Sequence, residues 1–201
     1  MSNNKKPTII CVTGPDGSGK STLIANLVNT LSNAVEVTIW DALNNDQVAL
    51  FSTKRDVDHY LCLLSPDARL LFLAHALKYA VDTAMESGIE TIILNAYYYK
   101  YFASEATLGA DIKLIKTLVS TFPIPDKTIF LSLPPEMCAS RKKHLSRYEC
   151  GCKEATLENF IDFQKKTALV FKSYKQPEWF VLNAEHSPEV LKEKTLKIIT
   201  Q

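Results

Sequence analysis

The stretch Gly14-Pro15-Asp16-Gly17-Ser18-Gly19-Lys20-Ser21-Thr22 decides the fold. It satisfies the pattern G-x-x-x-x-G-K-[ST] at every fixed position. The run before it, Thr8 to Thr13, is rich in β-branched residues and predicts a strand, whereas the residues from Lys20 to Ser32 have a helical pattern. A plain connecting turn is the alternative, but a strand on one side and a helix on the other favour a phosphate-binding loop.

The residue types of this loop suit a nucleoside triphosphate. Glycines let successive backbone N–H groups turn toward an anion, and the start of the following helix adds a positive dipole. Lys20 is expected to reach the β- and γ-phosphates, and Ser21 is expected to ligate Mg²⁺. The residues predicted to bind ATP are Gly14, Asp16, Gly17, Ser18, Gly19, Lys20, Ser21 and Thr22.

Strand-like and helix-like segments alternate along the rest of the chain. Further strands are predicted at Val35 to Trp40, Thr91 to Asn95, Lys127 to Leu133 and Trp179 to Leu182. A long helix should begin after Ser65 and end at Gly88, and others are predicted at Gly109 to Phe122, Pro135 to His144, Ala155 to Tyr174 and Pro188 to Thr200. This alternation predicts an α/β fold of the P-loop NTPase type, with a parallel sheet of roughly five strands, helices on both faces and ligands at the carboxyl ends of the strands.

Composition narrows the class of protein. The chain has 201 residues, of which 46% are hydrophobic and 22% charged, so we expect one globular domain over residues 1–201. The formal net charge of +1 gives no electrostatic case for a nucleic-acid partner. Only a short apolar run precedes the loop, and the five cysteines follow no pattern, which favours a cytoplasmic protein without a membrane span.

Four separated segments together resemble the thymidylate kinases and their deoxynucleotide-kinase relatives. These segments are the loop with its interior acid Asp16, the helical run Ala68-Arg69-Leu70-Leu71-Phe72-Leu73-Ala74, Leu131-Ser132-Leu133-Pro134-Pro135-Glu136 followed by Arg141, and Phe180-Val181-Leu182-Asn183-Ala184 with Ser187-Pro188-Glu189. The resemblance implies a kinase that uses ATP and Mg²⁺ to phosphorylate a nucleotide, dTMP in that family. It also implies a homodimer.

The resemblance assigns roles to individual residues. Phe72 matches the ring on which the family stacks the pyrimidine, although ordinary core packing explains a phenylalanine there equally well. Asp16 matches an acid associated with the sugar, and a turn-forming aspartate is the alternative. Arg141 matches the family's lid arginine. Independently of the resemblance, Arg141 and Arg147 are the candidate catalytic cations of a lid at about residues 141–153, because guanidinium groups bind phosphate bidentately, although a solvated basic helix face would have the same composition.

The chain departs from the family pattern in three regions. Asn95-Ala96-Tyr97 stands where the family has aspartate, arginine and an aromatic residue or histidine, so Asn95 is the expected but uncharged metal-site residue. Ala76 replaces an arginine of the substrate helix, and Asp41 to Thr53 contains no equivalent of another arginine. We therefore expect weak turnover of dTMP.

Substitutes for the missing arginines are available nearby. Tyr97 and Lys100, within a run of tyrosines, are predicted to line the acceptor pocket, unless that run packs as an aromatic cover on the sheet edge. Arg69, Lys78 and Lys100 are the cations that could replace the lost charge. His75 is either an acceptor contact or an ordinary helix residue. Cys150 and Cys152 lack the second ligand pair that a zinc site needs.

Two other functions stay open at this point. The chain could bind nucleotides through the loop without catalysing transfer, because Asn95 and Ala96 remove family groups. It could also phosphorylate a different nucleoside or another small molecule. A GTPase is disfavoured, since no Asn-Lys-x-Asp run occurs in the chain.

Overall fold

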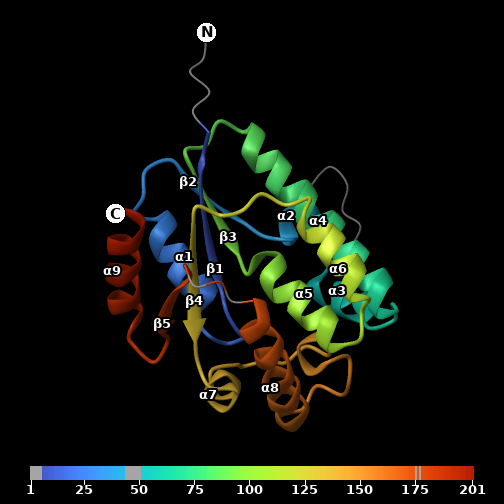
Figure 1. Cartoon of the computed structure of the whole chain (residues 1–201). Coiled ribbons are helices and arrows are strands. Elements are labelled where there is room, and N and C mark those ends of the chain that lie inside the picture. The colour runs from blue at the N-terminus through green and yellow to red at the C-terminus, as the bar shows by residue number, and fades with distance from the viewer. Residues whose placement is uncertain (1–5, 44–50, 175, 177) are drawn as a thin grey trace.

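The computed structural model describes residues 6–43, 51–174, 176 and 178–201, and these fold around a parallel sheet (Figure 1). Within them the sheet has five strands in the order β2-β3-β1-β4-β5, and every neighbouring pair is parallel. The strands are β1 (Thr8–Thr13), β2 (Ala34–Val37), β3 (Thr91–Asn95), β4 (Lys127–Ser132) and β5 (Phe180–Asn183). The α/β class expected from the alternating segments is confirmed.

Helices cover both faces of the sheet. Figure 1 shows α1 (Lys20–Val28) and α9 (Pro188–Ile199) on one side, and α4 (Pro66–Glu86), α5 (Tyr97–Thr107) and α6 (Ile112–Val119) on the other. The remaining helices are α2 (Trp40–Leu43), α3 (Lys54–Leu61), α7 (Pro135–Ser140), the short 3₁₀ helix η1 (Tyr148–Cys150) and α8 (Leu157–Tyr174). No described helix has both the length and the apolar character that crossing a bilayer requires.

Central strand β1 is buried on both faces. Ile9 and Cys11 point into the cluster that contains the buried side chains of α4 and α5, whereas Val12 points into the cluster that contains Leu23 and Leu27 of α1. Alternate residues of a strand face opposite sides, so a strand without a polar face needs helices on both. This burial fixes the position of the loop that follows β1.

Helix α4 follows its sequence signals closely. The Ser65 side chain accepts a hydrogen bond from the backbone N–H of Ala68, and Pro66 occupies the first turn. The apolar stripe is buried as expected: it comprises Leu70, Leu73, Ala74, Leu77, Val81 and Ala84. The helix ends just before Gly88, whose φ of 77° suits the left-handed conformation after a helix.

Several predicted ends were wrong. β2 ends at Val37 rather than Trp40, because the Thr38 N–H donates to Asp41 Oδ2 at 2.6 Å and starts α2. Helices expected at Gly109 to Phe122 and Pro135 to His144 are shorter: α6 begins only after the cap residue Asp111, and α7 ends at Ser140. These are local side-chain choices that hydrophobic periodicity does not report.

Besides the short α2, the helices α3 and α5 were not expected. α3 begins with a capping box, in which Thr53 and Asp56 each accept from the other's backbone N–H. α5 begins directly after β3, and the junction is strained because Ala96 and Tyr97 have φ values of 67° and 55°. Ala96 is held in this conformation by its N–H donating to Val12 O and by Thr13 Oγ1 donating to its carbonyl, both at 2.9 Å.

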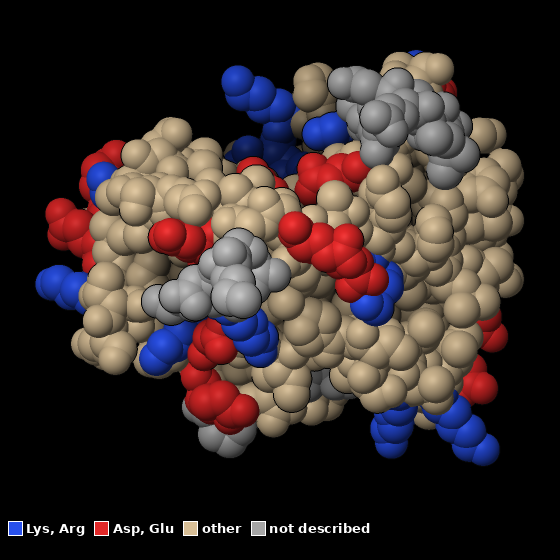
Figure 2. Space-filling view, turned by 90° about the horizontal axis from the view of Figure 1, so that it is seen from above, with Lys and Arg blue, Asp and Glu red and all other residues tan. Residues whose placement is uncertain are grey.

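Acidic and basic side chains are interspersed on the face at which the strands begin, which is the upper face in Figure 1 (Figure 2). A surface without a large patch of one sign agrees with the formal net charge of +1. The charges that matter for the site lie instead at the opposite end of the sheet, where the strands finish.

Candidate active site

The loop after β1 is held close to two other elements. A Cβ on Gly14 would lie 2.5 Å from Leu131 O of β4, and one on Gly17 would lie 2.5 Å from Cys138 O of α7. Both glycines also have positive φ, at 142° and 84°. These two positions therefore require glycine, and the loop backbone is packed between β4 and α7 as a rigid cradle.

Donor groups inside the loop fit a phosphate chain. α1 starts at Lys20 without a side-chain cap, which leaves its first N–H groups for an anion. The Ser18 hydroxyl is fully buried and has no hydrogen-bond partner among the described residues. A buried hydroxyl without a partner is uncommon, and a phosphate oxygen would satisfy it.

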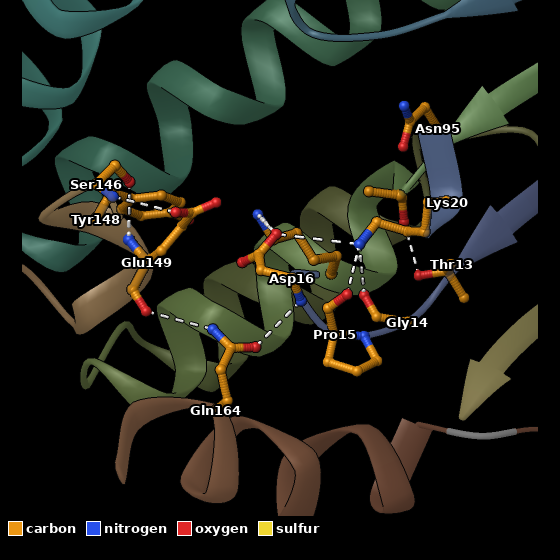
Figure 3. A network of polar contacts seen from close by, with 12 residues as sticks. Thr13, Gly14, Pro15, Asp16, Lys20, Asn95, Ser146, Tyr148, Glu149 and Gln164 are labelled. Atoms are coloured by element: carbon orange, nitrogen blue, oxygen red, sulfur yellow. Dashed lines mark hydrogen bonds and ion pairs between the residues drawn. The ribbon is translucent and has the colours of Figure 1, made fainter. Parts of the chain in front are cut away.

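Lys20 folds back over the loop in Figure 3. Its Nζ donates to Gly14 O at 3.0 Å and to Pro15 O at 2.7 Å, and it lies 4.0 Å from Asp16 Oδ1. Burial lowers the pKa of Lys20 to about 8, although the Asp16 carboxylate partly opposes this shift. A phosphate chain in the cradle would favour the charged lysine again.

A second buried cation faces the same carboxylate. Lys100 Nζ lies 3.0 Å from Asp16 Oδ1, and the lysine is only 8% exposed. Burial acts to lower the pKa of Lys100, but Asp16 outweighs it and the net pKa is raised. Burial acts likewise against the Asp16 carboxylate, whose pKa is nevertheless lowered by Lys100 and Lys20. The pair is therefore charged at neutral pH.

These groups open onto one cavity of about 1180 Å³. Its walls come from the loop, the end of β3, the starts of α3 and α5, and the lid segment, which comprises residues 141–153. The sequence-predicted residues on these walls are Asp16, Gly17, Ser18, Gly19, Lys20, Ser21, Thr22, Asn95, Lys100, Arg141 and Arg147. A cavity of this size has room for two ligands of nucleotide size.

The lid segment is held to the rest of the protein at its start and in its middle. Arg141 Nη1 donates to Ala184 O at 3.0 Å, and Arg147 Nη2 donates to Cys152 O at 3.2 Å. Asp58 of α3 accepts the backbone N–H groups of Arg147 and Tyr148 at 3.1 and 2.8 Å. Both arginines therefore stand at the cavity with their guanidinium groups bonded to backbone carbonyls.

Beneath the lid lies a buried ion pair. Arg69 Nε donates to Glu105 Oε2 at 2.8 Å, and the Tyr148 hydroxyl donates to Glu105 Oε1 at 2.9 Å. Glu105 is fully buried and Arg69 is 3% exposed. This network connects α4, α5 and the lid, so it is a structural support for the cavity wall.

A family model for thymidylate kinase matches residues 12–195. The chain belongs to the thymidylate kinase family. As a member, it is an ATP-dependent kinase, which agrees with the loop geometry.

Curated relatives and a solved structure agree with this assignment. A probable thymidylate kinase of Saccharolobus solfataricus is 28% identical over 95% of this chain and 96% of its own. The thymidylate kinase of Schizosaccharomyces pombe is 30% identical over 83% of this chain and 81% of its own. The structure of thymidylate kinase from Candida albicans is 20% identical, with a TM-score of 0.71 over 97% of this chain and 92% of that one, which supports the fold.

Tyr97 does not line the cavity, so its expected role at the acceptor is wrong. It is 1% exposed, its hydroxyl donates to Pro123 O at 2.9 Å, and its ring packs edge-on against Phe122. The reason is the strained start of α5: Tyr97 has a φ of 55°, outside the helical region, so its side chain does not lie on the face that Lys100 and Tyr101 present to the cavity.

Phe72 is also absent from the cavity walls, where the family resemblance placed it. It is half-buried and packs against Phe51 and Tyr60, with ring centroids 6.0 and 5.4 Å away. Ala76, which belongs to the same helix α4, is fully buried in the core. The packing alternative thus describes Phe72 better than base stacking in this structure.

Of the three cations expected as substitutes, Lys100 alone is on the cavity wall as described. Arg69 is committed to Glu105, and Lys78 pairs with Asp82 on the surface of α4. Sequence reasoning missed Lys54 and Arg55, which line the cavity from the first turn of α3. The Thr53-x-x-Asp56 capping box is the signal that would have located them.

The cysteines beside the lid have structural surroundings. The buried Cys150 thiol donates to Thr156 O, and burial raises its pKa to about 11. Cys152 accepts from Arg69 Nη1 at 3.4 Å. Within the described part of the chain, no group of three or more His, Cys, Asp or Glu residues is placed to hold a metal. A protein-only zinc site is therefore not present among those residues.

Proposed function

We propose that this kinase binds ATP together with Mg²⁺ and transfers the γ-phosphate to a nucleoside monophosphate. The acceptor in the family is dTMP. The main observation in support is that the phosphate cradle and a second buried cation, Lys100, open onto the same cavity. We treat residues 1–201 as one domain with a lid at residues 141–153. The relatives in Arabidopsis thaliana and Schizosaccharomyces pombe are named thymidylate kinases, which supports this acceptor class.

On the donor side, the loop would hold and orient the triphosphate. The backbone of residues 14–22 and the Ser18 hydroxyl donate to its oxygens, and Lys20 turns from Gly14 O and Pro15 O to the β- and γ-phosphates. Ser21 and Asn95 would hold the Mg²⁺, which neutralises phosphate charge when bound. Arg141 and Arg147 would stabilise the charge of the transferring group from the lid side.

On the acceptor side, Asp16 and Lys100 are the buried pair, and Lys54 and Arg55 add cations from α3. Ala96, on the cavity wall, carries no charge where the family has an arginine. Each missing charge-assisted contact costs roughly 1.5–3 kcal/mol. We therefore infer that an acceptor phosphate is held by different cations from those of the family, and that dTMP is a poor substrate.

The deciding experiment is ATP-dependent ADP release with each nucleoside monophosphate and nucleoside in turn. We expect turnover on at least one acceptor, loss of that turnover in Lys20→Ala, and a kcat/KM for dTMP below about 10⁴ M⁻¹s⁻¹. A dTMP value within the ordinary enzyme range would show that the missing arginines matter little. Tight ATP binding without turnover on any acceptor would favour the second candidate function, a protein that binds nucleotides without catalysing transfer. Asn95 and Ala96 are the reason for considering it, because they lack the charges of the family residues.

We also propose the family's homodimer and a cytoplasmic location. Exposed apolar side chains on α4 and α6, including Leu71 and Ile112 at 49% and 46% exposure, are the kind of surface that a dimer would bury. All five cysteines are free thiols, which suits a reducing compartment. Light scattering of the purified chain tests the first proposal, and a monomer at micromolar concentration would contradict it.

A further inference from the structure

A carboxylate stands one strand away from the position where the family has its aspartate. Glu36 belongs to the edge strand β2, and its Oε1 accepts from Asn95 Nδ2 at 2.6 Å. The same amide nitrogen donates to Ser21 Oγ at 3.2 Å. Asn95 therefore bridges an acidic side chain and the hydroxyl that the loop offers to a metal.

Strand register explains why these side chains meet. Glu36 pairs with Ile93 across β2 and β3, and paired residues of parallel strands point to the same face. Asn95 lies two residues beyond Ile93 and shares that face, which α1 covers. Ser21 is in the first turn of α1, directly at the carboxyl end of the sheet.

The contacts also fix the orientation of the Asn95 amide. Because Nδ2 donates to a carboxylate, the opposite assignment would place two acceptor oxygens together, so the amide oxygen must point away from Glu36. Asn95 lines the cavity, whereas Glu36 is half-buried behind it and is not on the cavity wall. The amide thus presents an oxygen acceptor to the cavity and has a negative charge behind it.

We propose that Glu36 is the acidic group of the magnesium site and acts through Asn95 as a positioning residue. In this chain the acid has moved from the end of β3 to the neighbouring strand. The inference rests on the proposed function in one respect, namely that Ser21 holds Mg²⁺ together with the nucleotide. A hydroxyl, an amide oxygen and a nearby carboxylate are the hard oxygen groups that Mg²⁺ prefers.

Asp16, the carboxylate inside the loop itself, does not fill this role. Lys100 and Lys20 lie 3.0 and 4.0 Å from its Oδ1, so its charge is neutralised on the other side of the loop. Glu36 has the Asn95 amide as its partner, which leaves its negative charge uncompensated by a cation in the contacts described. An uncompensated charge close to Ser21 attracts a divalent cation.

The test compares nucleotide binding with and without Mg²⁺, using a fluorescent ADP derivative and no acceptor. The variants are Glu36→Gln, the double variant Glu36→Gln/Asn95→Asp, which returns the acid to β3, and the control Glu90→Gln. Glu90 is exposed just before β3, at the far end of the sheet from Ser21, so its substitution makes the same charge change elsewhere.

We expect Glu36→Gln to reduce the Mg²⁺-dependent gain in ADP affinity about tenfold, which corresponds to about 1.4 kcal/mol. Metal-free ADP affinity should stay within twofold, because the cradle is unchanged. The double variant should recover the gain to within threefold of the parent chain, and Glu90→Gln should leave it unaltered. Mn²⁺ gives a second measure of metal affinity: when Mg²⁺ displaces it from the site, electron paramagnetic resonance detects the free Mn²⁺.

A merely structural role of Glu36 would give a different pattern. It would lower thermal stability and shift both ADP affinities equally, and the double variant would not recover the metal gain; that pattern overturns the proposal. If Glu36→Gln does not fold, Glu36→Asp replaces it in the test. Because the aspartate side chain is shorter, the Mg²⁺-dependent gain in ADP affinity should still fall several-fold. The proposal would also be overturned if Mg²⁺ had no effect on the ADP affinity of the parent chain. If ADP binding depends on Mg²⁺ but no phosphotransfer is detected, only the proposed function is refuted.

Discussion

The two halves of the cavity are built in different ways. The donor half is made by nine consecutive residues whose backbone groups are fixed by two glycine contacts with β4 and α7. The acceptor half is made by side chains from separate elements, including Lys54 of α3, Ala96 at the end of β3 and Lys100 of α5. A backbone cradle tolerates little change, while a set of side chains can be exchanged one at a time. We therefore expect substitutions to be tolerated more readily on the acceptor side than in the cradle.

The largest effect should come from breaking the donor half. Lys20→Ala removes the ammonium that the cradle directs at the phosphates, and loss of one such donor costs about 10²–10³ in kcat. Steady-state kinetics with the best acceptor checks this. Lys143→Ala is the matched control, because Lys143 is exposed on the lid segment and lies at the cavity rim. Equal losses in both variants would contradict the special role of Lys20.

Breaking the buried ion pair beneath the lid should act through stability rather than chemistry. Glu105→Gln leaves the buried Arg69 guanidinium without its counter-charge, which costs about 3–5 kcal/mol when a buried pair is broken. Thermal unfolding should show a Tm lower by about 6 °C or more. Asp82→Asn breaks the exposed pair with Lys78 and should cost less than about 1 kcal/mol. Similar Tm changes for the two variants would show that Glu105 does not support the wall.

Lys100→Gln should separate the two halves. It removes the buried cation beside Asp16, so the acceptor KM should rise by about tenfold or more, as expected when a charge-assisted contact is lost. The dissociation constant of ATP should change by less than about twofold, because Lys20 and the loop backbone stay in place. A larger change for ATP than for the acceptor would place Lys100 in the donor half instead.

The smallest effect concerns pH. The pKa of Lys20 is about 8, and bound phosphates would raise it. Below pH 8 the lysine is protonated both free and bound; above pH 8 the free form loses its proton, so binding must take one up and affinity falls. ATP affinity should therefore drop by up to about tenfold from pH 7 to pH 9. Calorimetry in two buffers of different ionisation enthalpy should detect the proton uptake.

Lys100→Gln sharpens this pH prediction. The Lys100 charge helps to lower the pKa of Lys20, so its removal should move the fall in ATP affinity to higher pH. An unchanged midpoint would show that the charge of Lys100 does not influence Lys20.

Sequence predicted the fold and the donor half because both depend on local, repeated signals. The loop motif, the β-branched runs and the Ser65 cap each specify structure within a few residues. The acceptor half was predicted less well, because Tyr97 and Lys100 lie three residues apart yet face opposite environments. The positive φ of Tyr97 at the start of α5 takes its side chain off the face that Lys100 occupies, and an aromatic run after a strand indicates neither that backbone conformation nor the helix.

Long-range partners were beyond sequence reasoning for a similar reason. Glu36 and Asn95 are 59 positions apart, and Arg69 and Glu105 are 36 apart. Their pairing depends on strand register and helix packing, which no single segment encodes. Asp58, which anchors the lid, lies in a helix that was not predicted.

The junction after β3 allows an arginine to be introduced at this site. Ala96 already adopts a positive φ with a Cβ in place, and the residue lines the cavity. Ala96→Arg would therefore lengthen a side chain without asking the backbone for a new conformation. One substitution can place an arginine at a position where this chain has alanine, so the contribution of that arginine is measurable here as a gain of acceptor affinity instead of a loss.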